Sequence, residues 1–298
     1  MPNPADRQGD SSALKRNLPR FSLSAEKRFG ICRFSRSPLD RTGSVGEECH
    51  AAGRRLGGQG ESMNFYTSIS SHYDAIFPVD AAEVSFIAKR LTGRKSVLDI
   101  GCGTGNKTVH YARAGRKVIA VDADPAMIAR AESVYAAPGV SYQVLSMLDL
   151  DREFPPCRFD ALLCLGNTLV HLPRPEQIRE MIVKMAGLLE DGGLAVIQIL
   201  NYDRILSQNI TALPLLETDQ IRFERSYVRQ GMEMRFVTKL TVKETGEEID
   251  NDIPLYPLRR GELDERLQSS GFWRTEYYGG RGEPFTDDSF VLFALAWK

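Results

Sequence analysis

Two short stretches combine glycines with polar side chains at points where apolar runs end. The first is LDIGCGTG, Leu98 to Gly105, and the second is LCLGNTLVHLP, Leu163 to Pro173. Glycines let a backbone approach a ligand closely, and a helix that starts behind them offers unpaired N–H groups. An amide and an imidazole, such as Asn167 and His171, can position a reacting group and accept a proton from it. Both stretches must then be brought to one edge of a sheet.

The chain from Met63 to the C-terminus predicts such a sheet, because short apolar runs alternate with helical patterns. The predicted strands are SVLDIG, KVIAVD, VSYQVLSM, FDALLCLGN and LAVIQIL. The predicted helices span Asp80 to Leu91, the residues from Gly105 to Gly115, Pro125 to about Ala136, and Pro175 to Leu189. Continuous apolar strands separated by helices indicate a doubly wound parallel α/β sheet with both faces covered.

After Asn201 the pattern changes to alternating apolar and polar residues. The runs IRFERSYV and MEMRFVTKLTVKE flank Arg229-Gln230-Gly231, which predicts a hairpin, and EEIDNDIPLYPL adds a third antiparallel strand. We therefore expect a small antiparallel insertion at about 217–257. A helix, RRGELDERLQSSGF, and a closing strand, FVLFALAWK, complete the domain.

The glycine-rich turn and the acid that follows it predict a nucleotide-type site. Asp122 ends the second strand about twenty residues after the turn, where a ribose needs a hydrogen-bond acceptor. Asn106 stands where a nicotinamide fingerprint has its third glycine. Asp99, at the entry to the turn, would repel a pyrophosphate and suits a cationic ligand. These features favour S-adenosylmethionine, which carries an ammonium and a sulfonium, over a dinucleotide.

The stretches VLDIGCGTG and VIAVDADPAMIARA resemble the first two motifs of class I S-adenosylmethionine-dependent methyltransferases. The resemblance covers roughly Tyr66 to Lys298. It implies a Rossmann-like seven-stranded sheet of order 3-2-1-4-5-7-6 with strand 7 antiparallel. It also implies a set of cofactor-binding residues, from the methionine end to the adenine: Tyr66, Tyr73, Asp99, Gly101, Cys102, Gly103, Gly105, Asp122, Ala123, Met127, Leu148, Asp149, Leu165 and Gly166.

A second resemblance concerns GNTLVHLP and GGLAVIQILNYDRIL, which are similar to segments of glycine N-methyltransferases and their small-molecule relatives. It implies that Asn167, His171 and Tyr202 act beside the transferred methyl group. One position departs from that family. Its arginine before Asn-Tyr-Asp, which holds the carboxylate of glycine, is Leu200 here. A leucine forms no bidentate pair with a carboxylate, so glycine is in doubt as the substrate, although Arg204, Arg222 or Arg225 could replace the arginine.

Several of these residues also have a purely structural explanation. Asp149 is equally a turn residue in LDLD, and His171 taken alone is a helix-cap or packing residue. Asn167 could satisfy turn amides. Tyr66 and Tyr73 belong either to the core or to a lid over the cofactor.

Composition restricts the other functions. Hydrophobic residues make up 42% and charged residues 26% of the 298 residues, which are ordinary globular values. Residues 1–62 carry eleven Lys and Arg against seven Asp and Glu, a balance of +4 that leaves −5 for the rest. A body with that balance is not suited to non-specific nucleic-acid binding. We expect residues 1–62 to be a disordered extension, with 63–298 as the methyltransferase domain.

Five cysteines without metal-ligand spacing, and no long apolar run, predict no metal site, no membrane span and a cytoplasmic location. The predicted activity is methyl transfer from S-adenosylmethionine, yielding S-adenosylhomocysteine, to a small-molecule nucleophile, most readily an amine. The insertion would cover the pocket or form a homodimer interface. The alternatives are a methyltransferase acting on RNA or protein, a non-catalytic S-adenosylmethionine-binding protein and, less favoured, a nicotinamide-dependent oxidoreductase.

Overall fold

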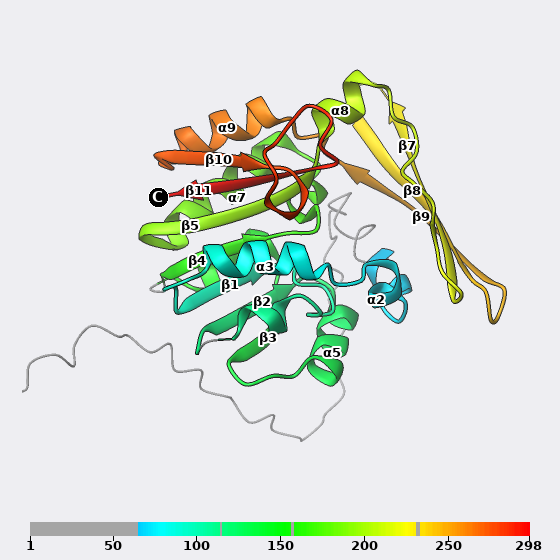
Figure 1. The fold of residues 1–298 in the computed structure, drawn as a ribbon, viewed down its shortest axis with the longest axis horizontal. Coiled ribbons are helices and arrows are strands. Elements are labelled where there is room, and N and C mark those ends of the chain that lie inside the picture. The colour runs from blue at the N-terminus through cyan, green and yellow to red at the C-terminus, as the bar shows by residue number, and fades with distance from the viewer. Residues whose placement is uncertain (1–64, 114, 156–157, 231–232) are drawn as a thin grey trace, which may run out of the picture. The chain divides into compact units, whose positions relative to one another are not determined.

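Strands and helices alternate along the first two thirds of the described chain (Figure 1). A computed structural model describes residues 65–113, 115–155, 158–230 and 233–298. The helices are α2 Tyr73–Ile76, α3 Ala81–Arg90, α4 Thr108–Tyr111, α5 Pro125–Val134, α6 Leu150–Glu153, α7 Pro175–Leu188, α8 Tyr202–Ser207 and α9 Arg260–Ser269. The strands are β1 Ser96–Ile100, β2 Lys117–Asp122, β3 Val140–Val144, β4 Phe159–Cys164, β5 Leu189–Leu200, β6 Leu216–Glu217, β7 Ile221–Gln230, β8 Glu233–Val242, β9 Glu247–Leu255, β10 Arg274–Tyr278 and β11 Val291–Trp297.

Seven strands form one sheet in the order β3-β2-β1-β4-β5-β11-β10. The neighbours from β3 to β5 are parallel, whereas β11 runs antiparallel to both β5 and β10. This is the predicted order 3-2-1-4-5-7-6 with strand 7 antiparallel, and the prediction is confirmed. The carboxyl ends of β1, β2 and β4 therefore lie along one edge, as the two polar stretches require.

Alternate residues of the central strands enter two separate cores, one on each face of the sheet. Val97 of β1 packs with Phe86 and Ile87 of α3, while its neighbour Leu98 packs in the larger core that contains Ile182 of α7. Side chains alternate between faces along a strand, so covering helices on both sides make every position of β1 beyond Ser96 a buried one. This arrangement fixes the direction of each side chain at the strand ends.

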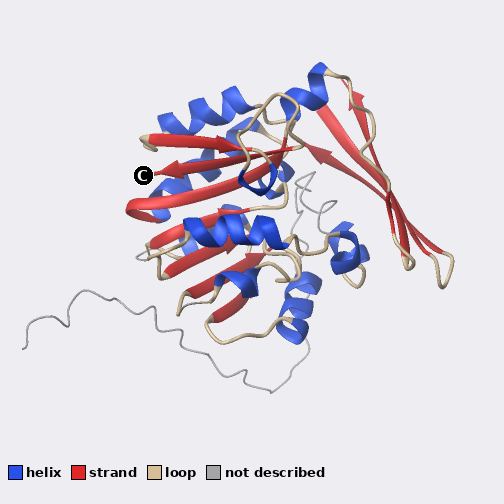
Figure 2. Cartoon of the chain, viewed as in Figure 1, coloured by secondary structure: helices blue, strands red, loops and turns tan. Residues whose placement is uncertain are grey.

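A second, antiparallel sheet of order β6-β7-β8-β9 extends from the end of α8 (Figure 2). It confirms the expected hairpin and third strand at about 217–257, with a short extra strand, β6. The hairpin loop itself, at 231–232, lies outside the described residues. Phe223 and Phe236 on one face contact Phe77 and Phe65 of the segment before α3. The insertion is thus packed on the N-terminal segment of the domain.

Four details differ from the sequence-based expectation. The helix expected between Gly105 and Gly115 is only the single turn α4, since Gly105 at φ 78° and the bends around it delay its start. Strand β5 begins at Leu189, so the turn residues Asp191 to Gly193 lie inside it at a shift of register with β4. Strand β6 was not predicted, and the sixth strand of the implied order, to which the sequence assigned no residues, is β10. The expectations for residues 1–62 and for Met63 lie outside the described residues.

Within the described ranges, no helix has the length and apolar character needed to cross a bilayer. The same ranges contain no group of three His, Cys, Asp or Glu side chains placed to hold a metal ion.

Candidate active site

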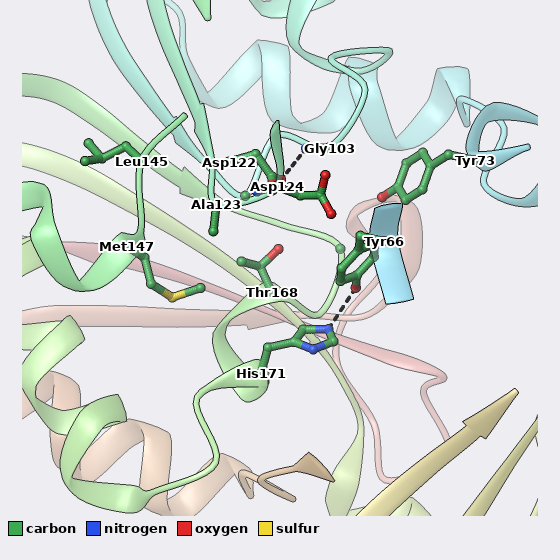
Figure 3. Close-up of a pocket in the computed structure, with 12 residues that line it drawn as sticks. Tyr66, Tyr73, Gly103, Asp122, Ala123, Asp124, Leu145, Met147, Thr168 and His171 are labelled. Atoms are coloured by element: carbon green, nitrogen blue, oxygen red, sulfur yellow. Dashed lines mark hydrogen bonds between the residues drawn. The ribbon is translucent and has the colours of Figure 1, made fainter. Parts of the chain in front are cut away.

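A pocket opens at the carboxyl ends of β1, β2 and β4, below residues of the N-terminal segment (Figure 3). It encloses about 610 Å³ of space, open solvent at its mouth included. The lining residues are Tyr66, Tyr73, Gly101, Gly103, Asp122, Ala123, Asp124, Leu145, Met147, Gly166, Thr168 and His171. Leu145 and Met147 lie on the side opposite Tyr66 and Tyr73. The pocket therefore has an apolar end and an aromatic end with Asp122 between them.

Asp122 occupies the centre of the pocket because it is the last residue of β2. Its Oδ2 accepts from the Gly103 N–H at 2.9 Å, and its Oδ1 accepts from the Asp124 N–H at 2.9 Å. A carboxylate has about four lone-pair sites, so each oxygen can still accept from a ligand. Burial raises the pKa of Asp122 to about 6, against the backbone hydrogen bonds, which lower it. The carboxylate is therefore ionised at neutral pH.

The glycine-rich turn comes close to side chains from distant parts of the chain. Gly101 and Gly103 have positive φ angles of 71° and 57°. A Cβ at Gly103 would lie 3.2 Å from the Tyr73 ring, and one at Gly101 would collide with the Thr168 side chain. Only glycine meets both demands, positive φ and close approach, so the backbone itself forms this wall of the pocket.

The end of β4 is fixed by Asn167, which links it to β5 and α8. Asn167 adopts φ 67°, and its Oδ1 accepts from the Leu200 N–H at 3.0 Å. Its Nδ2 donates to the Tyr202 hydroxyl at 3.0 Å. The side chain therefore holds two strand ends and α8 together immediately behind Gly166.

His171 and Tyr66 form the aromatic end of the pocket. The Tyr66 hydroxyl and His171 Nε2 are 2.9 Å apart, and their rings meet edge to face at 5.4 Å (Figure 3). Burial lowers the pKa of His171 to about 4 and raises that of Tyr66 well above its ordinary value. Both side chains are therefore neutral at physiological pH, and this end of the pocket disfavours charge.

The segment that carries Tyr66 and Tyr73 is fastened over the glycine-rich turn and α5. Thr67 donates to Asp124 Oδ2 at 2.7 Å, and Asp124 also caps α5 through its other oxygen. Asp74 of α2 accepts from Thr104 in the turn at 2.5 Å and pairs with Arg130 of α5 at 3.0 Å. Residues 65–77 thus cover the pocket in the position expected of a lid.

Several residues with predicted cofactor roles lie behind the pocket wall. Asp99 shares the face of Val97, and accepts from Thr108 Oγ1 at 2.7 Å, while burial raises its pKa to about 6. Gly105 lies against the Tyr142 ring. Burial of the Cys102 thiol raises its pKa. Leu165 packs in the core on the α3 side of the sheet.

The predicted residues on the adenine side are also outside the lining. Met127 is fully buried in the first turn of α5. The Leu148 carbonyl accepts from Lys184 at 2.6 Å, and Asp149 pairs with Arg152 at 3.5 Å on the surface. These contacts are those expected if Asp149 is a turn residue. Tyr202 and Asn167 support the wall from behind.

Four lining residues are outside the predicted set: Asp124, Leu145, Met147 and Thr168. Asp124 precedes Pro125, so the sequence signals a helix cap, which it is, without indicating that the same carboxylate borders a pocket. Leu145 and Met147 follow β3 directly. The rule that ligands sit beyond the carboxyl ends of strands could have found them.

The comparisons with known proteins agree with this geometry. Residues 97–193 match a family model described as a methyltransferase domain. The glycine/sarcosine/dimethylglycine N-methyltransferase of Actinopolyspora halophila is 27% identical over 70% of this chain and 37% of its own length. The glycine/sarcosine N-methyltransferase of Aphanothece halophytica is 27% identical over 70% of this chain and 78% of its own. The chain thus spans little more than a third of the first relative.

Two solved structures share the fold. The CcbJ methyltransferase of Streptomyces caelestis superposes with a TM-score of 0.65 at 21% identity, over 78% of this chain and 96% of its own. The sugar N-methyltransferase KedS8 of Streptoalloteichus has a TM-score of 0.60 at 20% identity, over 87% and 98%. The domain match, the relatives and the strand order support a class I S-adenosylmethionine-dependent methyltransferase.

Proposed function

We propose that the protein transfers a methyl group from S-adenosylmethionine to the amine of a small molecule. The observation that carries this proposal is the pocket itself, in which an ionised carboxylate and a glycine wall face a neutral aromatic end across a single cavity. The first half suits a cationic nucleoside and the second a neutral amine. The N-methyltransferases among the relatives, and the sugar N-methyltransferase that shares the fold, support this choice of acceptor.

The donor half of the pocket is formed by Gly101, Gly103, Asp122, Asp124, Leu145 and Met147. Asp122 would accept from the ribose hydroxyls with the lone pairs that Gly103 and Asp124 leave open. Leu145 and Met147 would hold the adenine, and Gly101 and Gly103 would let the methionine end approach the backbone. The pocket offers no Cβ where that approach occurs, which is the fit expected for this ligand. Asp99 lies outside the lining and would act only by holding the turn through Thr108.

The bound donor supplies an activated methyl group on a cationic sulfur. The protein therefore needs to align the acceptor and exclude water rather than to activate the donor. The Asp122 and Asp124 carboxylates stabilise positive charge in the donor half. Residues 65–77 cover this half and keep it dry, with Tyr73 placed over Gly103.

In the acceptor half, Tyr66, Asn167, His171 and Tyr202 position the amine. An ammonium must lose its proton before its nitrogen can attack. The surroundings that lower the pKa of His171 also lower that of a bound ammonium, because the same desolvation disfavours both cations. His171 accepts a hydrogen bond or the leaving proton directly or through water, and Tyr66 holds its ring in place.

The test is a screen for radiolabelled methyl transfer over amines, amino acids, phenols, an RNA pool and a protein extract. We expect transfer to one or more small amines and none to RNA or protein. The matched control is Asp191→Asn, an exposed acid near the start of β5 that pairs with Lys298 and lies at the other end of the strands, which should keep full activity. Labelling confined to RNA or protein would refute the proposal. Calorimetric binding of the donor with no transfer to any acceptor would leave the non-catalytic alternative.

The proposed catalytic unit is 63–298, working in the cytoplasm, with residues 1–62 as an appendage. Deleting residues 1–62 should leave donor affinity and the melting temperature close to those of the full chain. A large loss of either would show that the appendage belongs to the folded unit.

A further inference from the structure

Gln198 is the one polar side chain in the apolar run LAVIQIL, which forms the second half of β5. It is only 7% exposed. Alternation along the strand puts it on the face of Val196, and its register partner on β11 is the buried Phe293. An amide buried on such an apolar face lowers stability unless it is hydrogen-bonded. The hydrogen bonds that Gln198 makes therefore explain its place in the strand.

Gln198 holds both N–H groups at the turn that follows β4. Its side-chain Oε1 accepts from the Gly166 N–H at 2.5 Å, and its backbone carbonyl accepts from the Asn167 N–H at 3.1 Å. The register between β4 and β5 ends one residue earlier on β5, where Cys164 pairs with Ile197. The side chain of Gln198 thus extends the pairing of the two strands into the turn.

The turn needs such support because two consecutive residues lie in the left-handed region. Gly166 has a φ angle of 69° and Asn167 one of 67°, and the Thr168 N–H closes the turn on the Leu165 carbonyl at 3.3 Å. Asparagine tolerates this region better than most residues, yet the region still disfavours any side chain. A conformation of this kind persists where the surrounding contacts over-determine it.

The turn sets the direction of the residues that line the pocket beyond it. Gly166, Thr168 and His171 all line the pocket, whereas Gln198 lies outside the lining. Thr168 to His171 form a short helical turn that starts directly after Asn167. A change at Gly166 and Asn167 would therefore rotate this helical turn and carry His171 away from Tyr66, its partner at 2.9 Å.

We infer that Gln198 is a positioning residue for methyl transfer, which fixes the turn after β4 and, through it, the place of His171 beside the acceptor. This inference rests on the proposed function for the role of the acceptor half. The hydrogen bonds of Asp122 go to Gly103 and Asp124, so the ribose site does not depend on Gln198. Gln198 takes no part in the chemical step.

The first experiment measures the hydrogen bond in the unliganded full chain, without any turnover. Amide hydrogen exchange at Gly166 is followed by NMR in the wild type, in Gln198→Met and in Gln198→Glu. Methionine is an unbranched side chain of the same length without an oxygen, so the Gly166 amide should exchange at least roughly tenfold faster. Glutamate, ionised or protonated, keeps an oxygen there and should restore most of the protection.

The matched control is Gln177→Met, because the side-chain oxygen of Gln177 has no hydrogen-bond partner within the described residues. It should leave exchange at Gly166 unchanged. In the same spectra, the ring signals of His171 should shift in Gln198→Met and stay in place in Gln177→Met. Wild-type protection at Gly166, or unmoved His171 signals, in Gln198→Met would overturn the positioning role.

The second experiment uses an amine that the screen identifies as an acceptor. Gln198→Met should lower kcat by roughly tenfold to a hundredfold, because the acceptor loses its alignment, and Gln198→Glu should recover most of that loss. Affinity for S-adenosylhomocysteine should stay within about threefold of wild type in both variants, which also shows that they are folded. Gln177→Met should keep wild-type values of both quantities.

The two experiments separate this inference from the proposed function. A wild-type kcat in Gln198→Met, despite faster exchange at Gly166, would refute the positioning role while the amine methyltransferase assignment stands. Absence of transfer to every amine would refute the proposed function. The exchange rates and the His171 signals would then still decide whether Gln198 holds the turn and the imidazole in place.

Discussion

The donor and acceptor halves of the pocket are buried to a similar degree, but the donor half is anionic and the acceptor half is neutral. Desolvation drives Asp122 and His171 toward their neutral forms, raising the pKa of the acid to about 6 and lowering that of the imidazole to about 4. Because pH 7 lies above both pKa values, the carboxyl group of Asp122 is ionised and the imidazole of His171 is neutral. The same burial thus leaves an anionic half beside a neutral one.

This difference corresponds to the two partners of a methyl transfer. A cationic sulfonium would be stabilised next to Asp122 and Asp124, whereas an amine must be uncharged to react and would meet the neutral side chains of His171 and Tyr66. The division predicts that substitutions in the donor half change ligand affinity and that those in the acceptor half change turnover.

The largest effect is expected for Asp122→Ala. Two charge-assisted hydrogen bonds to the ribose, each contributing about 1.5–3 kcal/mol, would be lost, so donor affinity should fall by at least roughly a hundredfold. Isothermal titration calorimetry with S-adenosylhomocysteine, the product formed from the donor, measures the affinity of the donor half. Asp191→Asn again serves as the control. An affinity within about threefold of wild type would remove Asp122 from the donor site and end the proposed division.

The next effect is expected in turnover. Asn167→Gly retains the positive φ of this residue but removes its links to Leu200 and Tyr202, and His171→Ala removes the partner of Tyr66. Each should lower kcat by roughly tenfold to a hundredfold, because the acceptor loses its alignment. Donor affinity should stay within about threefold. If donor affinity falls as far as kcat, the two halves are not separable.

Much of this arrangement follows from the sequence. The apolar runs and the proline and glycine boundaries predict the main sheet, and position at strand ends correctly places Asp122, Gly166 and His171 at the pocket. The sequence also indicates where the Asp99 side chain points. Alternation along the strand puts Asp99 on the face of Val97, toward α4 and away from the pocket, whereas the turn motif alone predicts a role in binding the cofactor.

Other features depend on contacts between distant residues, which periodicity does not encode. Tyr66 and His171 are 105 residues apart in the chain, and nothing in either local sequence pairs them. The short strand β10, Arg-Thr-Glu-Tyr-Tyr, has no fully buried residue and no aliphatic side chain, so its pattern resembles a loop.

A third effect uses pH to separate the halves. As the pH falls from 7 to 5, Asp122 becomes protonated around pH 6, and donor affinity should drop by about tenfold per pH unit below that value. The stability of the unliganded protein should change in the opposite sense. The folded pKa of this acid exceeds its unfolded value, so its contribution to the unfolding free energy rises as pH falls from about 6 toward 4.

Asp122→Asn should remove most of the pH dependence of donor affinity and weaken binding at pH 7. The measurement is calorimetric titration of wild type and variant across this range. His171, with its pKa near 4, should contribute nothing between pH 7 and 5. A pH profile unchanged in Asp122→Asn would mean that another group, such as Asp99, carries the titration.

The smallest effect compares one glycine from each half. Gly101 and Gly166 have nearly equal φ angles, 71° and 69°, so alanine pays the same left-handed penalty of roughly 1–2 kcal/mol at either position. A Cβ at Gly101 also meets the Thr168 side chain, whereas one at Gly166 meets no atom within 4 Å. Gly101→Ala should therefore lower the unfolding free energy by about 1–3 kcal/mol more than Gly166→Ala, measured by urea denaturation. Adding Thr168→Ser removes the methyl group in conflict and should recover part of that difference for Gly101→Ala alone. Equal losses for the two alanine variants would mean that the turn of the donor half shifts to make room, and that its close approach to the end of β4 is not fixed by the fold.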